Sequence, residues 1–426
     1  MTVFWLLNFL PPPMARALDL PVQASGSWVM ALQQALEEQP VRLILCAYSP
    51  AVSETQRREI GGAVYLALPA AGGKEALQAA LAAEQPDLLQ IFGTENDHAV
   101  WALESFAPQK TLLYIQGLAG PCGEHMANGL PPRFLRRQRM KERLAARTGG
   151  ATVRQLREGL LEKGEAEKKV FALARNVLGR TEWDKAFTAS VNPQARYYKL
   201  NEILRPPFYS GGWQRDPLRR PRIFVSQGNI PLKGLHRVIE ALPAIAARYP
   251  DVQVDVAGWP PPRKGALLQP VMNWLAEYPG YLDQLARRLG VADRIRYTGV
   301  LNAEAWKTCF LQSSVFLLPS SLENSPNSLG EAILLGMPCA AANVGGVPSM
   351  MEDKKEGLLF DPARPDQMPQ AVLALLDDPA GAEAMGKAAR ARAMADHDPK
   401  AIAAAQMALY NQLCGAKEAK PGTRPW

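Results

Sequence analysis

Residues 315–347 read VFLLPSSLENSPNSLGEAILLGMPCAAANVGGV. The apolar run 315–318 ends at Pro319 and predicts a buried strand, and a helical pattern over 328–335 stops at Gly336. A second short apolar run, 339–343, predicts the next strand. Strand, loop, helix and strand in this order indicate a parallel α/β sheet, in which ligands bind beyond the carboxyl ends of the strands.

The start of the predicted helix has the features of an anion-binding site. Ser325 suits the N-cap position and Pro326 the first helical position. The amides of Asn327 and Ser328 would then lie at the positive end of the helix dipole, where phosphate groups bind.

Two glutamates flank this helix start. Glu323 lies in the loop and Glu331 inside the helix, with seven residues between them. Such carboxylates can accept hydrogen bonds from the hydroxyl groups of a ligand. Alternatively, Glu331 only complements the helix dipole and Glu323 is a solvated loop residue. The pattern alone does not choose between these interpretations.

A second loop favours phosphate binding. The predicted strand 222–226 is followed by Gln227, Gly228 and Asn229, then by Lys233 and a helix. A lysine at a glycine-flanked turn can neutralise a diphosphate through charge-assisted hydrogen bonds. The spacing is not that of a Walker A loop, and the alternative is a surface lysine in an ordinary strand-to-helix turn.

The chain as a whole predicts two α/β domains. Its 426 residues exceed what one core usually serves, and 47 % apolar with 21 % charged residues is a globular balance. Residues 205–221 are rich in Pro and Gly and predict a linker between domains at 1–207 and 218–396. The other predicted strands are 3–10, 41–47, 88–92, 111–115, 252–257 and 295–298, and the other helices are 27–38, 74–84, 234–249, 281–289, 303–312 and an alanine-rich region over 382–413.

The formal net charge of +7 resides in one segment. Residues 131–160 hold nine Lys or Arg and two Glu, so the rest of the chain is neutral overall. A nucleic-acid partner is therefore not expected. A helix over 133–147 would carry its cations on one broad arc, which suits an anionic membrane surface bound through 133–157. The alternative is a solvated face that helps to hold an anionic acceptor.

Cysteine and histidine usage excludes several site classes. The five cysteines form no CxxC pair and the four histidines share no metal-ligand spacing, so neither disulfides nor a metal site are expected. The apolar N-terminus is short and ends at Pro11, unlike a signal peptide. No run approaches the ~20 apolar residues of a spanning helix. We expect a cytoplasmic protein, or one peripheral on the inner face of the membrane.

At this point a family resemblance emerges. Glu323 and Glu331, Lys233 with Gly234, and the closing Gly345-Gly346-Val347 resemble the donor site of retaining, family 4 glycosyltransferases of the GT-B fold. SQGNIPLKGLH (226–236) and SSLENSPNSLGEAILLGMP (320–338) are most similar to the bacterial polysaccharide-assembly members. IFGTENDH (91–98), YIQGL (114–118) and GRTEWDKA (179–186) resemble the same subgroup.

The resemblance implies two Rossmann-like domains with parallel sheets that face a central cleft. The acceptor would bind the N-terminal domain and the nucleotide sugar the C-terminal one, and a C-terminal helix of about 397–416 would pack back on the first domain. Glu331 would bind the ribose, and Glu323 would contact the transferred sugar. Lys233 and the amides of Asn327 and Ser328 would hold the diphosphate, with no metal and no cofactor besides the donor.

The remaining implied site residues are Gln227, Gly228 and Asn229 on the donor side and Gly26, Ser27, His98 and Gln116 on the acceptor side or in the cleft. Gln227 stands where many members have arginine, and Gln116 where many have histidine, so it cannot act as an acid or base. Trp183 and Asp184 are expected to stabilise the domain.

The expected function is hexosyl transfer from a nucleoside-diphosphate sugar to a glycan or lipid-linked acceptor in cell-surface polysaccharide synthesis. Two alternatives stay open: a nucleotide-sugar epimerase on the same fold, and a non-catalytic partner subunit that binds glycan or nucleotide.

Overall fold

The computed structural model describes residues 1–22, 26–147, 150–216, 218, 220–261 and 269–415. The chain divides into two compact units, each described separately. Unit 1 comprises Met1–Leu118, Lys163–Leu204 and His397–Trp426, and unit 2 comprises Ala119–Glu162 and Arg205–Asp396. Helix α7 (Val153–Leu173) runs from one unit into the other.

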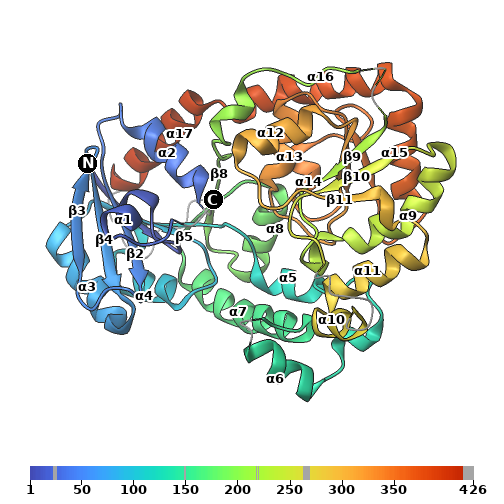
Figure 1. The fold of residues 1–426 in the computed structure, drawn as a ribbon. Helices are drawn as coiled ribbons and strands as arrows, with labels where there is room; N and C mark the ends of the chain where they lie inside the picture. The colour runs from blue at the N-terminus through green and yellow to red at the C-terminus, as the bar shows by residue number, and fades with distance from the viewer. Residues whose placement is uncertain (23–25, 148–149, 217, 219, 262–268, 416–426) are drawn as a thin grey trace. The chain divides into compact units, whose positions relative to one another are not determined.

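Unit 1 is built on an eight-stranded sheet of order β3-β4-β2-β1-β5-β6-β7-β8 (Figure 1). All neighbours are parallel except β3 and β4. Its strands are β1 (Thr2–Leu7), β2 (Arg42–Ser49), β3 (Gln56–Ile60), β4 (Ala63–Pro69), β5 (Leu88–Phe92), β6 (Thr111–Tyr114), β7 (Asn176–Gly179) and β8 (Arg196–Lys199). Its helices are α1 (Pro12–Ala17), α2 (Ser27–Leu36), α3 (Gly73–Glu84), α4 (Asp97–Ser105), α8 (Glu182–Val191) and α17 (Pro399–Gly415).

The central strands of unit 1 are apolar on both faces because helices cover both. On β1, Phe4 and Leu6 belong to a core cluster that includes side chains of α3 and α4. The intervening Trp5 donates its indole N–H to the Tyr410 hydroxyl of α17 at 2.9 Å. Uninterrupted apolar runs are typical of such parallel strands, which is why the sequence revealed them.

The hairpin β3–β4 was not predicted. Its turn is Gly61-Gly62, with φ of +58° and +79°, the left-handed values that a two-residue hairpin turn of this kind needs. Strand β3 is polar and mostly exposed, so it carries no apolar alternation to reveal it. This antiparallel edge strand departs from the parallel sheets expected.

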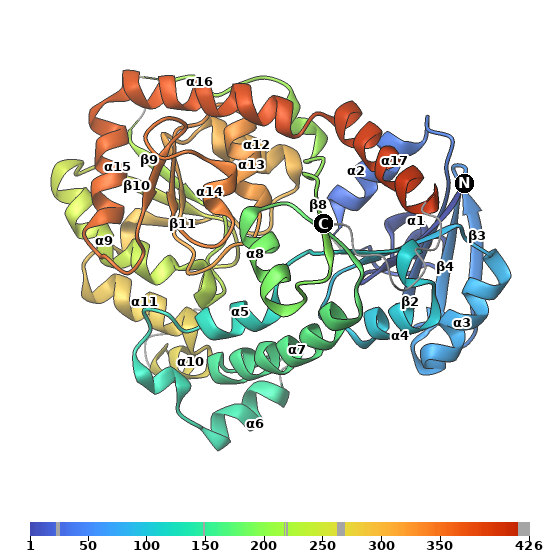
Figure 2. The same cartoon turned by 180° about the vertical axis from the view of Figure 1, so that it is seen from behind.

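The C-terminal region forms two helices, the second of which begins close to the start of the expected C-terminal helix at about 397. Helix α16 (Pro379–Asp396) belongs to unit 2 and α17 to unit 1, with a break at His397. The His397 Nδ1 lies 2.7 Å from the Glu202 carbonyl oxygen of unit 1. Helix α17 packs against α2 and β5, and Figure 2 shows α17 beside α2. Residue 416, at the end of the expected helix, lies outside the described residues.

Unit 2 contains a six-stranded, fully parallel sheet of order β11-β10-β9-β12-β13-β14. Its strands are β9 (Arg222–Val225), β10 (Gln253–Val256), β11 (Ile295–Tyr297), β12 (Val315–Leu318), β13 (Cys339–Ala342) and β14 (Leu358–Phe360). Strand order reverses between β9 and β12, the position at which doubly wound sheets bind ligands. The expected class, α/β with two Rossmann-like parallel sheets, is confirmed.

The helices of unit 2 form two groups. Helices α9 and α15 pack together and α11 joins α9, whereas α13 packs on α16. The helices are α5 (Ala119–His125), α6 (Arg139–Arg147), α9 (Leu235–Arg248), α10 (Gln269–Leu275), α11 (Tyr278–Arg288), α12 (Ala303–Leu311), α13 (Asn327–Leu334), α14 (Val347–Met350), α15 (Gln367–Asp377) and α16.

Residues 119–162 group with unit 2, although the sequence placed them in the N-terminal domain. The buried His236 of α9 lies 3.2 Å from the Asn128 carbonyl oxygen through Nε2. Phe134 packs edge-on against Tyr281 at 5.3 Å between ring centroids. These contacts join positions more than 100 residues apart, so no local sequence pattern predicts them.

The basic segment does not form one continuous helix over 133–147. Residues Pro132–Leu135 form a 3₁₀ turn, and α6 begins only at Arg139. Lys141 is buried, 3.5 Å from the Glu277 carboxylate, and Arg154 pairs with Glu142 at 2.8 Å. Part of the positive charge is therefore neutralised internally. The exposed cations of the turn and α6 are Arg133, Arg136, Arg137, Arg139, Arg143 and Arg147.

Candidate functional site

Two loops meet at the carboxyl edge of the unit 2 sheet. Gly234 has φ of +74°, and a Cβ atom there would lie 2.1 Å from the Pro319 carbonyl oxygen. The Ser321 amide also donates to the Leu232 carbonyl oxygen at 2.8 Å. Only glycine permits so close an approach, so the turn after β9 and the loop after β12 are held side by side.

This approach joins the two side chains that the sequence singled out. Lys233 Nζ lies 2.7 Å from Glu323 Oε1, and the Ser320 hydroxyl donates to the same oxygen at 2.6 Å. The Gly346 amide donates to the Glu323 carbonyl oxygen at 3.0 Å. Glu323 is only 8 % exposed. A carboxylate fixed in this way is pre-oriented, while its cation remains within reach of a ligand.

The helix start differs from its expected capping. Helix α13 begins at Asn327, preceded by Pro326, and no side chain caps it. The Ser325 hydroxyl instead points to Met350 Sδ, at 3.7 Å, so the prediction that Ser325 is the N-cap was wrong. The first amides of a helix have no partner within it. Those of Asn327 and Ser328 are therefore oriented for an anion.

Glu331 is held by an arginine that sequence reasoning had assigned to the linker. Arg205 Nε lies 2.5 Å from Glu331 Oε1, and Nη2 lies 2.6 Å from Oε2. The guanidinium is 5.0 Å from the Phe208 ring centre and 5.3 Å from that of Trp306. Arg205 and Glu331 are 126 positions apart, and no spacing rule links them.

Burial and the ion pair act in opposite directions on the pKa of Glu331, and burial is the larger effect. The Glu331 side chain is 2 % exposed, and burial raises the pKa of this carboxyl while hydrogen bonding and the charge of Arg205 oppose that rise. Each oxygen retains lone-pair capacity beyond its bond to Arg205. Glu331 therefore retains the capacity to accept hydrogen bonds from ligand hydroxyl groups.

The turn after β9 supplies backbone rather than further charge. Gly228 is buried, and a Cβ there would lie 2.6 Å from Leu235 and Val256 side-chain atoms. Gln227 is half-buried and Asn229 is exposed. The Asn229 amide lies near Gly258, just after β10. Within this turn, Lys233 is the residue that can neutralise a phosphate.

The acceptor-side candidates lie in unit 1 and are described within it. Gly26, with φ of +80°, precedes α2, and a Cβ there would overlap the Phe9 ring at 2.0 Å. Ser27 is the first residue of α2. His98, on α4, stacks on Tyr48 at 4.0 Å, and burial lowers the pKa of its imidazole. A neutral, stacked ring is therefore expected.

Gln116 follows β6 and rests on a buried network. Its carbonyl oxygen accepts from Arg180 Nη2 at 2.6 Å, and Arg180 also pairs with Glu202. Its side-chain Nε2 is buried without a hydrogen-bond partner among the described residues. Asp184 completes a capping box with Thr181 at the start of α8, which supports the expected stabilising role of this stretch.

The described part of the chain offers neither a metal-binding cluster nor a membrane-spanning helix. There, no three His, Cys, Asp or Glu side chains gather closely enough to hold an ion. None of its helices combines the length and apolar character needed to cross a bilayer. Metal independence stays a prediction.

The segment that carries these residues is similar to known proteins. Residues 214–392 match the family described as Glycosyl transferases group 1. The match covers the edge that carries Lys233, Glu323 and Glu331.

Among curated relatives, the GDP-mannose-dependent alpha-(1-6)-phosphatidylinositol monomannoside mannosyltransferase of Mycolicibacterium smegmatis is 30 % identical over 178 residues, 40 % of this chain and 42 % of that protein. The glycogen synthase of Mycobacterium tuberculosis is 29 % identical over 178 residues, 42 % of this chain and 39 % of that protein. The chain thus spans about two fifths of the length of the curated relatives it matches.

Solved structures extend the similarity to both units. Sucrose-phosphate synthase of Thermosynechococcus elongatus has a TM-score of 0.69 at 18 % identity and covers 97 % of this chain and 99 % of its own. HepE of Anabaena, solved in complex with UDP, has a TM-score of 0.61 at 15 % identity and covers 97 % and 100 %. These similarities establish the GT-B fold expected from the sequence.

Proposed function

We propose that the protein is a retaining, metal-independent glycosyltransferase of family 4. It would transfer a sugar from a nucleoside-diphosphate sugar to a glycan or lipid-linked acceptor in cell-surface polysaccharide synthesis. The observation that carries the proposal is the pairing of Lys233 with Glu323 beside the uncapped start of α13. The family match over residues 214–392 supports it.

The arrangement assigns a role to each group. Glu331 accepts hydrogen bonds from the ribose hydroxyls, and Glu323 contacts the transferred sugar. Lys233 and the amides of Asn327 and Ser328 hold the diphosphate as it leaves. Charge that develops on the leaving group is stabilised by donors already in place.

The transfer step needs no reactant other than the donor and the acceptor. The bond between the anomeric carbon and the diphosphate oxygen breaks, and a bond to the acceptor hydroxyl oxygen forms on the same face. The proton of that hydroxyl goes to the departing diphosphate. Glu323, held by Lys233 and Ser320, steadies the positive charge at the anomeric carbon.

The first test is donor binding followed by turnover. UDP-glucose and GDP-mannose are the first donors to screen, because solved and curated relatives carry these nucleotides in their names. A donor at a hundred times its Kd stabilises the folded protein by about 2.7 kcal/mol, measurable as a shift in Tm. The absence of a shift with any nucleoside diphosphate or nucleotide sugar would contradict the proposal and favour a non-catalytic glycan-binding protein.

Turnover separates transfer from epimerisation. Nucleotide release is measured with and without a panel of saccharides and their phosphates. A transferase releases nucleotide in proportion to the product glycoside, whose anomeric configuration NMR reports. Donor consumed at an equal rate without an acceptor would identify the epimerase instead. Unchanged transfer in EDTA is expected, and loss of transfer would refute metal independence.

The exposed basic segment suggests where an acceptor is met. Met140 is 67 % exposed and Leu135 is 43 % exposed, among the exposed arginines of the turn and α6. Cations beside exposed apolar side chains suit the surface of an anionic membrane. We therefore propose peripheral binding on the inner face of the membrane, in a cytoplasmic protein.

Liposome sedimentation tests this binding. Replacing Arg136, Arg137, Arg143 and Arg147 with glutamine is expected to abolish binding to phosphatidylglycerol vesicles while donor binding is retained. A matched control replaces the exposed Arg248, Arg287, Lys355 and Lys387, with the same change in net charge. Equal loss in both variants, or no vesicle binding by the unaltered protein, would contradict the proposal.

A further inference from the structure

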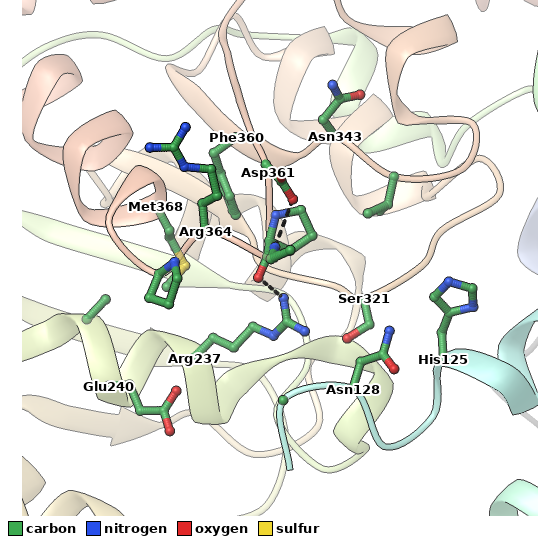
Figure 3. Close-up of a pocket in the computed structure, with 16 residues that line it drawn as sticks. His125, Asn128, Arg237, Glu240, Ser321, Asn343, Phe360, Asp361, Arg364 and Met368 are labelled. Atoms are coloured by element: carbon green, nitrogen blue, oxygen red, sulfur yellow. Dashed lines mark hydrogen bonds between the residues drawn. The ribbon is translucent and has the colours of Figure 1, made fainter.

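A cavity of about 660 Å³ lies in unit 2, and apart from Ser321 its lining residues lie outside the donor-site sequences 226–236 and 320–338 (Figure 3). It is enclosed by the start of α9, the ends of β13 and β14, and the segment after α5. Its volume is in the range of small-molecule sites. The polar side chains central to the argument are His125, Asn128, Arg237, Ser321 and Asn343.

Among the described residues, no carboxylate lies within ion-pair distance of Arg237, although Glu240 and Asp361 line the same cavity. Arg237 Nη1 donates to the Pro362 carbonyl oxygen at 2.5 Å, and its Nε is buried with no hydrogen-bond partner among the described residues. Burial lowers the pKa of this guanidinium, while Glu240 and Asp361 act on it only through longer-range attraction. A partly buried, incompletely bonded cation is costly, and an anion in the cavity would offset that cost.

Ser321 also lines this cavity and carries a second unmet polar group. It is 3 % exposed, and its hydroxyl is buried without a hydrogen-bond partner among the residues the structure describes. Figure 3 shows the Ser321 hydroxyl on the same side of the cavity as the Asn128 amide. Buried hydroxyls are normally bonded, so an unbonded one in the wall that Arg237 also lines favours a polar occupant of the cavity.

The cavity wall is rigid where these groups meet. Gly129 has φ of +81°, and a Cβ there would lie 2.8 Å from His236 Nε2. His236 also contacts the Tyr278 hydroxyl, at 3.1 Å from Nδ1. The segment that carries Asn128 is thereby fixed against α9. Asp361 faces the same cavity, but its Oδ1 already accepts from the Ala363 amide at 2.8 Å.

We propose that this cavity is a second binding site, for the phosphate or carboxylate group of a carbohydrate, with Arg237 and Ser321 as its anion-binding residues. The apolar side chains of Val344, Phe360 and Met368 complete the lining and suit the less polar faces of a sugar ring. The site does not depend on glycosyl transfer. Ser321 nevertheless lies two residues from Glu323, so an occupant would contact the loop that carries the donor-site carboxylate.

Isothermal titration of the full chain tests the site with glucose 6-phosphate, glucuronate, inorganic phosphate and glucose. One or both charged sugars are expected to bind, and the tighter of the two identifies the anion. Arg237→Gln is expected to weaken this binding about ten- to a hundredfold, as the loss of a charge-assisted hydrogen bond does. Ser321→Ala is expected to weaken it less, and it keeps the test available if Arg237→Gln does not fold.

Two controls make the result decisive. Arg248→Gln lies on the same helix, is exposed and pairs with Asp377, so it is expected to bind the charged sugars normally. Lys233→Ala removes the donor-site cation and is also expected to leave this binding unchanged. The proposal is overturned if no charged sugar binds, if glucose binds as tightly, if Arg237→Gln binds normally, or if only Lys233→Ala abolishes binding.

Discussion

The two sheets of this protein share a doubly wound architecture, but their carboxyl edges differ in how charge is exposed. In unit 1, Arg180 and Glu202 are 4 % and 2 % exposed, so the pair is sealed. At the carboxyl edge of unit 2, Glu323 and Glu331 each pair with a more exposed cation: Lys233 is 26 % and Arg205 is 23 % exposed. A sealed pair serves folding, whereas a pair open on one side can also meet a ligand.

The largest effect is expected at the open pair nearest the chemistry. Glu323→Ala or Lys233→Ala should lower kcat at least about a thousandfold, because both groups stabilise charge that develops during transfer. Nucleotide release under saturating donor measures this loss. Lys355→Ala, which breaks an exposed pair with Glu352 in the same unit, is the control and should retain full activity. Full turnover by Glu323→Ala would refute the site.

Breaking the sealed pair of Arg180 and Glu202 should lower the stability of the protein. Arg180→Leu leaves the buried Glu202 without its cation, and breaking a buried pair costs about 3–5 kcal/mol. Chemical unfolding of the variant measures the loss. Donor binding by the folded fraction should be unchanged, because Arg180 belongs to unit 1. A variant as stable as the unaltered protein would show that the two edges do not differ in this way.

Acid should distinguish the two units. Burial lowers the pKa of His236 in unit 2 to about 4. In the unfolded chain, the His236 imidazole takes up a proton below about pH 6.5. In the folded protein, it stays neutral until the pH falls to about 4. Stability is therefore full above pH 6.5 and falls by about 3 kcal/mol as the pH drops to 4.

Unfolding free energies at pH 7 and pH 4.5 measure this dependence. His236→Gln should flatten it, whereas His98→Gln in unit 1, which removes a half-buried imidazole, should flatten it less. Equal slopes in His236→Gln and the unaltered protein would exclude His236 as the source.

The smallest effect is expected at the second open pair. Arg205→Leu should raise the donor Kd about tenfold, because burial without Arg205 favours the neutral form of Glu331, a weaker acceptor for ribose hydroxyls. The loss should shrink at higher pH, where Glu331 ionises again. Donor titration at pH 6 and pH 8 checks this. A purely structural role for Arg205 would leave the donor Kd without that pH dependence.

The sequence predicted the parts of unit 2 that are locally encoded. The predicted helix 328–335 and the observed Asn327–Leu334 differ by one residue, because an apolar periodicity and the Gly336 stop define it. Lys233 and Glu323 were identified as site residues before their 2.7 Å contact was known. The hairpin β3–β4 escaped prediction because its outer strand is exposed and polar.

Long-range pairing set the limit of prediction. Arg205 belonged to a Pro-rich stretch that indicated only a linker, yet it binds Glu331. Lys141 was counted among surface cations, yet it is buried beside Glu277. The environment of each of these side chains depends on a partner more than 100 positions away. The composition of the surrounding segment does not predict that partner.

The sequence by itself determined the class of the fold and the loops that bear the donor-site residues. Strand periodicity, glycine turns and helix ends are local properties of the chain, governed by backbone sterics and apolar burial. Only the tertiary structure decided which charges are neutralised, which cations stay open, and that Arg237 faces a cavity with incomplete bonding. The free energy of a charge depends on burial and partners, and these exist only once distant segments have packed together.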